Sequence, residues 1–166
     1  AKGAGFPGDA ILLLYLLTVP SLAIILGGSS SGNVLASVGI SREIKLLLGY
    51  ELPFACALII PALASGMTTS LADIVRFQNA NGMTIGSFAG ITGFVIALFA
   101  LQGKIGLVPF DLAEAEAELA GGALIEYSGI LLGLFKLAKA ILLIVGPLFL
   151  IGLYFGGINF SSLAGI

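Results

Sequence analysis

Long stretches without a charged residue constrain this chain more than any other feature. Residues 10–41, 77–103 and 140–166 contain no Asp, Glu, Lys or Arg. A helix that crosses a membrane needs roughly 20 mainly apolar residues, so each stretch is long enough to hold one. Hydrophobic residues make up 58% of the chain, charged residues only 10%, and the mean hydropathy is +1.15. Because a soluble domain is usually about one quarter charged, these values indicate an integral membrane protein and exclude a soluble enzyme.

The residue types that are absent or rare narrow the function further. The 166 residues include no His and one Cys. Zinc sites, iron–sulfur clusters, His-based catalysis and disulfide frameworks are therefore excluded within the chain. The net charge of −2 provides no basic surface for nucleic acid. We expect no catalytic residue, no metal site and no cofactor in this chain, and we expect the lipid bilayer as one of its partners.

The apolar pattern predicts an all-α membrane protein, a bundle of about four transmembrane helices in a single domain over residues 1–166. The expected spans are about 9–27, 42–65, 84–101 and 125–155, and an acidic loop covers 104–122. The last span is longer than a bilayer requires. It must tilt, protrude or break near Gly146 and Pro147, and one long helix is the preferred interpretation because no polar turn divides it.

Five acids gather on one side of the predicted membrane. On a helix, positions 111, 114 and 118 share a face, and like charges spaced in this way repel each other. If the acids are partly buried, such a cluster can hold and pass protons. A solvated loop is the alternative, although only Lys104 lies nearby as a local cation. The acids are Asp111, Glu114, Glu116, Glu118 and Glu126.

The basic residues predict which side this is. With four crossings, Lys2 and Arg76 share one side, whereas Arg42, Lys45 and Lys104 share the other. The excess of Lys and Arg on the second side favours it as the cytoplasmic one. The acidic loop lies on that side, so the prediction is a multi-pass protein of the cell membrane with a cytoplasmic acidic loop.

Glu51 is an acid inside the second predicted span. A carboxylate within a membrane helix costs about 3 kcal/mol unless it is paired, protonated or hydrated. Pro53 and Pro61 follow in the same span and remove the helical donors of the Gly49 and Ala57 carbonyls. Glu51 is therefore a candidate for ion transfer, with a structural hydrogen bond to a neighbouring helix as the alternative.

Two lysines lie inside the fourth predicted span. Lys136 and Lys139 fall on the helix that the sequence predicts from residue 125, and Glu126, Gly129, Gly133 and Lys136 would form one stripe along it. The two glycines would let another helix approach closely. Both lysines would reach the membrane surface only if this helix protrudes. Together with the acids, they predict a path of titratable groups for ions or charge.

Several motifs resemble one known family. The segment VPFDLAEAEAELAGG (108–122), followed by IEYSG (125–129), resembles the acidic loop of the family of complex I subunit 1. SREIK (41–45) and GYELP (49–53) resemble the family segment that carries its membrane glutamate. The resemblance covers nearly the whole chain. LFKLAK (134–139) and REIKL (42–46) resemble most the energy-converting membrane-bound [NiFe] hydrogenase branch, which includes archaeal enzymes.

The resemblance implies a role that the composition does not. Family members anchor a peripheral electron-transfer arm and begin the charged path for proton or sodium translocation, and they have about eight helices, so this chain corresponds to their core. The implied partners are antiporter-like and other membrane-arm subunits and the hydrogenase large and small subunits, which hold [NiFe] and iron–sulfur clusters. The implied coupling residues are Glu51, Asp111, Glu114, Glu116, Glu118, Glu126, Lys136 and Lys139, and the implied docking or supporting residues are Arg42, Glu43, Lys45 and Tyr127.

Two alternatives stay open. The chain also resembles a subunit that helps to form the quinone site of a respiratory complex I, and only the segment with Lys136 and Lys139 argues against that assignment. Quinone is expected only in that case. The chain is also consistent with a structural anchor whose charges merely dock the arm. Under the coupling and quinone hypotheses, the redox chemistry still belongs to other subunits of an oxidoreductase complex.

Overall fold

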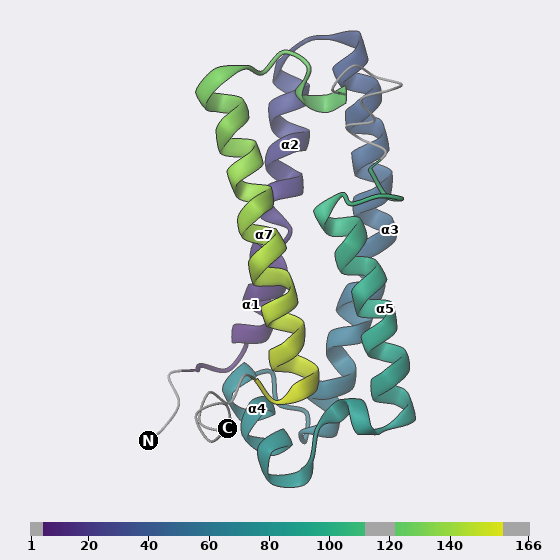
Figure 1. Cartoon of the computed structure of the whole chain (residues 1–166), viewed down its shortest axis with the longest axis vertical. Helices are drawn as coiled ribbons and strands as arrows, with labels where there is room; N and C mark the ends of the chain where they lie inside the picture. The colour runs from purple at the N-terminus through teal and green to yellow at the C-terminus, as the bar shows by residue number, and fades with distance from the viewer. Residues whose placement is uncertain (1–4, 112–121, 158–166) are drawn as a thin grey trace, which may run out of the picture.

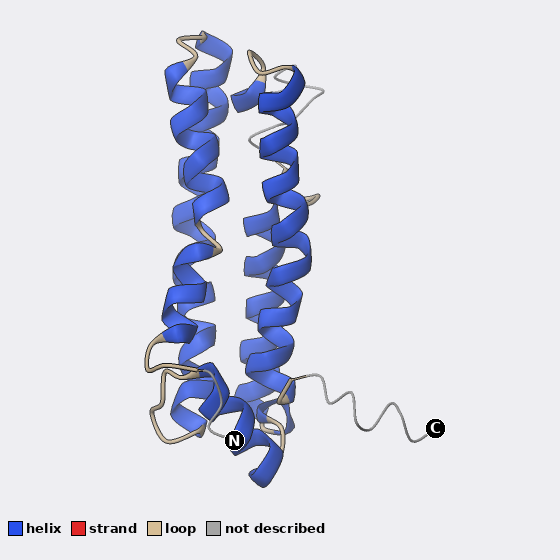
Figure 2. Ribbon diagram, turned by 90° about the vertical axis from the view of Figure 1, so that its left-hand side faces the viewer, coloured by secondary structure: helices blue, strands red, loops and turns tan. Residues whose placement is uncertain are grey.

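The computed structural model describes residues 5–111 and 122–157, and this part of the chain is helical, with turns and loops between the helices. Four segments are long and apolar enough to cross a membrane: Asp9–Ser30, Val34–Ala64, Phe88–Ile105 and Gly129–Phe155. They lie side by side in an elongated bundle (Figures 1 and 2). The predicted all-α membrane architecture with about four long helices is confirmed.

The first membrane segment consists of two helices, α1 (Asp9–Leu16) and α2 (Val19–Ser30). Pro20 has no backbone N–H, so it cannot donate to the carbonyl of Leu16 and the helix is interrupted there. The hydrogen-bond pattern resumes when the Leu22 amide donates to the Thr18 carbonyl at 3.2 Å. This interruption presents Thr18 to the interior of the bundle, where it is buried.

Helix α3 (Val34–Ala64) begins at Val34 rather than near residue 42, as the sequence predicted. The side chain of Asn33 caps it by accepting a hydrogen bond from the Leu35 amide at 2.8 Å, which favours an earlier start. The helix has 31 residues, about 46 Å at the usual rise, and it continues through Pro53 and Pro61. The hydroxyl of Tyr154 donates to the Ala57 carbonyl, which Pro61 leaves without a helical donor, at 2.6 Å.

A short amphipathic helix, α4 (Leu71–Asn81), and a 3₁₀ turn, η1 (Thr84–Gly86), lead into α5 (Phe88–Ile105). The hydroxyl of Ser87 caps α5 by accepting a hydrogen bond from the Gly90 amide at 2.9 Å. The sequence predicted that this helix ends near residue 101 and that Lys104 lies in the acidic loop. In the structure, α5 continues to Ile105 and ends at Gly106 in the left-handed conformation, so Lys104 belongs to the helix.

After the 3₁₀ turn η2 (Gly122–Leu124), the last helix, α7 (Gly129–Phe155), runs through Pro147 without a break. This agrees with the single long helix that was preferred, although it begins at Gly129 rather than near residue 125. Glu126 therefore precedes the helix, and the predicted stripe from Glu126 to Lys136 does not include its first member. The tight turn before α7 forces this difference, because Gly129 has a positive φ of 60°.

The helices differ in how far they reach along the bundle. Helix α3 packs most extensively against α5. The end of α5 is level with the middle of α3, since a Cβ placed on Gly103 would lie 3.3 Å from the ring of Tyr50. The first halves of α3 and α7 and most of α2 extend beyond that level (Figure 1). A small apolar cluster of Ile24, Ile40, Ala123 and Leu124 holds this extension together, separate from the main core.

Candidate functional site

A buried ion pair joins the middle of α3 to the end of α5. The ammonium Nζ of Lys104 lies 2.7 Å from Oε2 of Glu51. The Lys104 side chain is fully buried, whereas that of Glu51 is 24% exposed. Lys104 was not among the predicted site residues, because the sequence placed it in the loop as the cation nearest to the acidic run.

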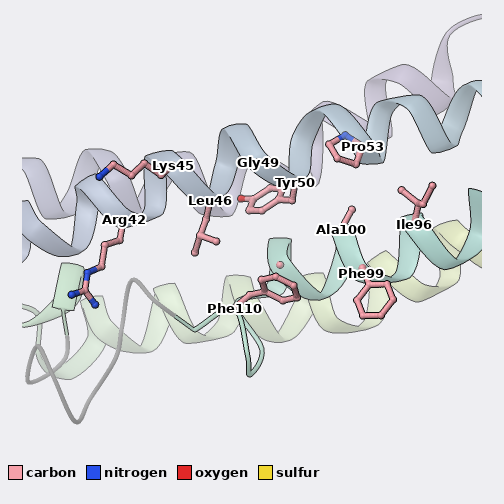
Figure 3. Close-up of a pocket in the computed structure, with 11 residues that line it drawn as sticks. Arg42, Lys45, Leu46, Gly49, Tyr50, Pro53, Ile96, Phe99, Ala100 and Phe110 are labelled. Atoms are coloured by element: carbon pink, nitrogen blue, oxygen red, sulfur yellow. The ribbon is translucent and has the colours of Figure 1, made fainter.

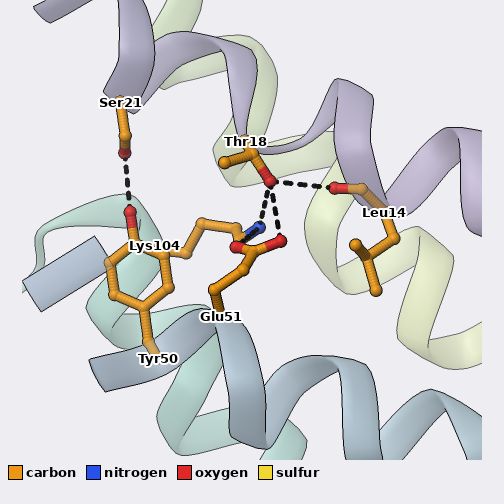
Figure 4. Close-up of polar contacts among 6 residues, drawn as sticks. All are labelled: Leu14, Thr18, Ser21, Tyr50, Glu51 and Lys104. Atoms are coloured by element: carbon orange, nitrogen blue, oxygen red, sulfur yellow. Dashed lines mark hydrogen bonds and ion pairs between the residues drawn. The ribbon is translucent and has the colours of Figure 1, made fainter. Parts of the chain in front are cut away.

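Thr18, at the break between α1 and α2, forms hydrogen bonds with both members of the ion pair (Figure 4). The Lys104 ammonium also donates to Oγ1 of Thr18 at 2.8 Å. The Thr18 hydroxyl has two acceptors within reach, Oε1 of Glu51 at 3.0 Å and the Leu14 carbonyl at 3.1 Å, and its single proton serves one of them at a time. Three helical segments thus meet at one carboxylate, one ammonium and one hydroxyl.

Aromatic side chains enclose the ammonium. Nζ of Lys104 lies 5.0 Å from the centre of the Phe54 ring and 5.6 Å from that of Tyr50. A cation above an aromatic face is attracted by the ring's electrons, which offsets part of the cost of removing it from water. The Tyr50 ring is held in place because its hydroxyl shares a hydrogen bond of 2.8 Å with the hydroxyl of Ser21 (Figure 4).

This arrangement can respond to charge. A buried ion pair is screened little by solvent, so a charge that appears nearby changes its energy far more than it would on a surface. The ammonium has acceptors on two elements, and the carboxylate keeps some exposure. The group therefore has the parts needed to exchange a proton when its electrostatic surroundings change.

Glu126 and Tyr127 lie together at the far end of the bundle. Glu126 is exposed and accepts a hydrogen bond from the side-chain amide of Asn33. The Tyr127 hydroxyl donates to the Gly27 carbonyl at 2.7 Å, and its ring packs edge-on against Phe135. Tyr127 thus ties the start of α7 to the end of α2, and its docking or supporting role stays a prediction.

The two lysines of α7 lie near the level at which α5 ends. Lys139 is half-buried, and a Cβ placed on Gly106 would lie 3.5 Å from its Nζ. Lys136 is exposed one turn earlier. Their helix extends beyond the end of α5, and whether the two lysines reach the membrane surface stays a prediction.

The remaining predicted residues fall into two groups. Arg42, Glu43 and Lys45 lie on the part of α3 that extends beyond α5, and Arg42 and Lys45 line a groove between these two helices. Asp111 is half-buried at the edge of the described chain. Glu114, Glu116 and Glu118 lie outside the described residues, so their clustering stays a prediction. Among residues 5–111 and 122–157, no three His, Cys, Asp or Glu side chains are grouped to hold a metal ion.

Comparison with known proteins gives consistent matches. A family model described as NADH dehydrogenase matches residues 3–164. Among curated proteins, NADH-quinone oxidoreductase subunit 8 of Thermus thermophilus is 36% identical over 148 residues. That alignment covers 87% of this chain and 40% of the relative, so the chain spans less than half the length of the curated relative that it matches.

Proposed function

The chain belongs to the NADH dehydrogenase family, and we propose that it is the subunit in which electron transfer by partner proteins is converted into ion movement. The observation that carries this proposal is the buried group of Glu51, Lys104 and Thr18. An ion pair in a membrane bundle is costly, and replacing such a pair by apolar residues often stabilises a protein. A functional requirement for charge at this position would explain why the chain keeps the ion pair despite its cost.

In this proposal, a change of charge in the peripheral arm changes the strength of the attraction between Lys104 and Glu51. Lys104 can stay with Thr18 while its contact with Glu51 weakens, because the ammonium donates to both. Glu51, which retains 24% exposure, would then exchange a proton with water or with a neighbouring acid. Asp111, Glu114, Glu116, Glu118, Glu126, Lys136 and Lys139 are the proposed continuation of the path.

We propose a membrane-bound hydrogenase as the parent assembly, with the chain as its membrane anchor. The basis is the LFKLAK segment, which resembles that branch. The partners would then be antiporter-like membrane subunits and the hydrogenase large and small subunits. A quinone-reducing complex is the second candidate, and it is favoured by the relative's name, NADH-quinone oxidoreductase subunit 8. Affinity purification of the intact assembly decides between them: nickel and hydrogen oxidation support the first, and quinone-dependent electron transfer supports the second.

The test of ion coupling is made in that intact assembly. Glu51→Gln is expected to leave assembly and electron transfer in place but to lower the ions moved per electron at least tenfold. Asp73→Asn is the matched control, because Asp73 is an exposed acid on α4 that pairs with Arg76 away from the bundle interior. Wild-type transport by the Glu51→Gln assembly would contradict the coupling role. The structural-anchor alternative predicts instead that Glu51→Gln changes nothing, whereas charge-neutral substitutions in the acidic run release the arm.

A further inference from the structure

A groove of about 510 Å³ runs between α3 and α5 (Figure 3). Its walls are mostly apolar and include Leu46, Pro53, Ile96, Phe99 and Phe110. Pockets of this size are typical of small-molecule sites. The groove lies on the outside of the bundle, since Phe99 and Ile96, at the end of the groove opposite to Arg42, remain 60% and 48% exposed.

The charge in this groove is confined to one end. Arg42 and Lys45 lie one turn apart on α3, beyond the apolar side chains (Figure 3). Glu43 lies between them in the sequence but is not part of the groove lining. The groove is therefore amphipathic along its length, with a basic end and an apolar body.

The helix lengths determine where the apolar body and the basic end of the groove lie relative to the end of α5. Helix α5 has 18 residues, about 27 Å at the usual rise, which is close to the roughly 30 Å of a bilayer's hydrocarbon core. Tyr50 marks the level at which α5 ends, because it packs against Gly103. Lys45 and Arg42 precede Tyr50 on α3 and so lie beyond this level. The apolar walls consequently lie along the length of α5, and the two cations lie beyond its end.

We propose that this groove is a binding site for an anionic phospholipid. Its phosphate would lie against Lys45 and Arg42, and one acyl chain would follow the walls formed by Leu46, Phe99 and Ile96. Two cations beside the headgroup favour an anionic lipid over a zwitterionic lipid or a neutral ring compound, because cationic side chains near a membrane surface each attract anionic lipid. The proposal does not depend on the ion-coupling role.

The first test compares two lipids that differ only in their headgroups. The full chain in detergent micelles is titrated with phosphatidylglycerol or phosphatidylcholine of identical acyl chains, and bound lipid is counted by native mass spectrometry. Phosphatidylglycerol is expected to bind about tenfold more tightly. Arg42→Gln combined with Lys45→Gln should reduce the affinity for phosphatidylglycerol to that for phosphatidylcholine. Arg76→Gln removes an exposed cation from α4 and should change nothing.

The second test fills the groove without a charge change. A Cβ placed on Gly49, which lines the groove, or on Gly133 of α7 meets no atom within 4 Å, so both positions accept a larger side chain. Gly49→Leu should abolish the preference for phosphatidylglycerol, whereas Gly133→Leu should preserve it. Equal affinity for the two lipids in the wild-type chain would overturn the proposal. A preference that survives both Gly49→Leu and the double charge variant would overturn it as well, and Gly49→Leu remains decisive if the charge variant does not fold.

Discussion

Glu51 and Glu126 are two carboxylates of one bundle in opposite settings. Glu51 lies at mid-length of α3 and faces a fully buried ammonium from α5. Glu126 lies at the end of the bundle, exposed, beside the side-chain amide of Asn33. The difference shows how depth determines the partner: a carboxylate among apolar helices requires a full opposite charge, whereas one in contact with water needs only a neutral donor.

The comparison also bears on function. The contact at Glu126 joins two loops and can be explained by the fold alone. The contact at Glu51 brings together a lysine of α5, a threonine at the break between α1 and α2, and two aromatic rings of α3 itself. Such convergence in a place where charge is costly is the reason that the proposal of ion coupling rests on Glu51, with Glu126 only in the proposed continuation of the path.

Removing the buried cation should have the largest effect on stability. Lys104→Met leaves the Glu51 carboxylate without its charge partner, and we expect a loss of about 3 kcal/mol in the free energy of unfolding. The value lies at the lower end for a broken buried pair because Glu51 is partly exposed. Unfolding in mixed detergent micelles measures it. Adding Glu51→Gln to Lys104→Met should recover part of the loss, and no recovery would mean that the two groups do not interact.

Thr18→Val tests how much the hydroxyl of Thr18 contributes to the stability of the buried site. Valine has nearly the same shape but lacks the hydroxyl that accepts from Lys104 and donates to Glu51. We expect a loss of about 1 to 2 kcal/mol, which the same unfolding assay would detect. Thr18→Ser keeps the hydroxyl and should cost less. Equal losses in the two variants would point to packing rather than hydrogen bonding.

Glu126→Gln is expected to have the smallest effect. The glutamine side chain still offers an oxygen to the Asn33 amide, and the site is exposed. The loss in unfolding free energy should be below about 0.5 kcal/mol, as for most surface substitutions. A loss as large as that of Lys104→Met would show that the two carboxylates do not differ in the way proposed.

The sequence predicted the membrane class, the long helices and Glu51 because each depends on local composition. It did not predict Lys104, since this residue follows an uncharged stretch and reads as the first residue of a polar loop. Only the packing of α5 against α3 brings Lys104 to Glu51, and nothing in the sequence fixes that alignment. The start of α3 was misplaced for a related reason: the cap at Asn33 outweighed the polar residues from Ser41 onward.

The acidic segment is predicted from composition and from resemblance. Its composition predicts a cluster of interacting carboxylates, and its resemblance implies a coupling role. The structure adds that Lys104, their predicted local cation, already contacts Glu51.

The most direct test of the central claim is a double-mutant cycle on transport. Ions moved per electron would be measured in the intact assembly with Glu51→Gln, with Lys104→Gln and with both changes. If the two residues act as one unit, each single change should lower the ratio at least tenfold, and the double change should lower it no further than the worse single one. Losses that multiply, or transport that survives both changes, would contradict the account.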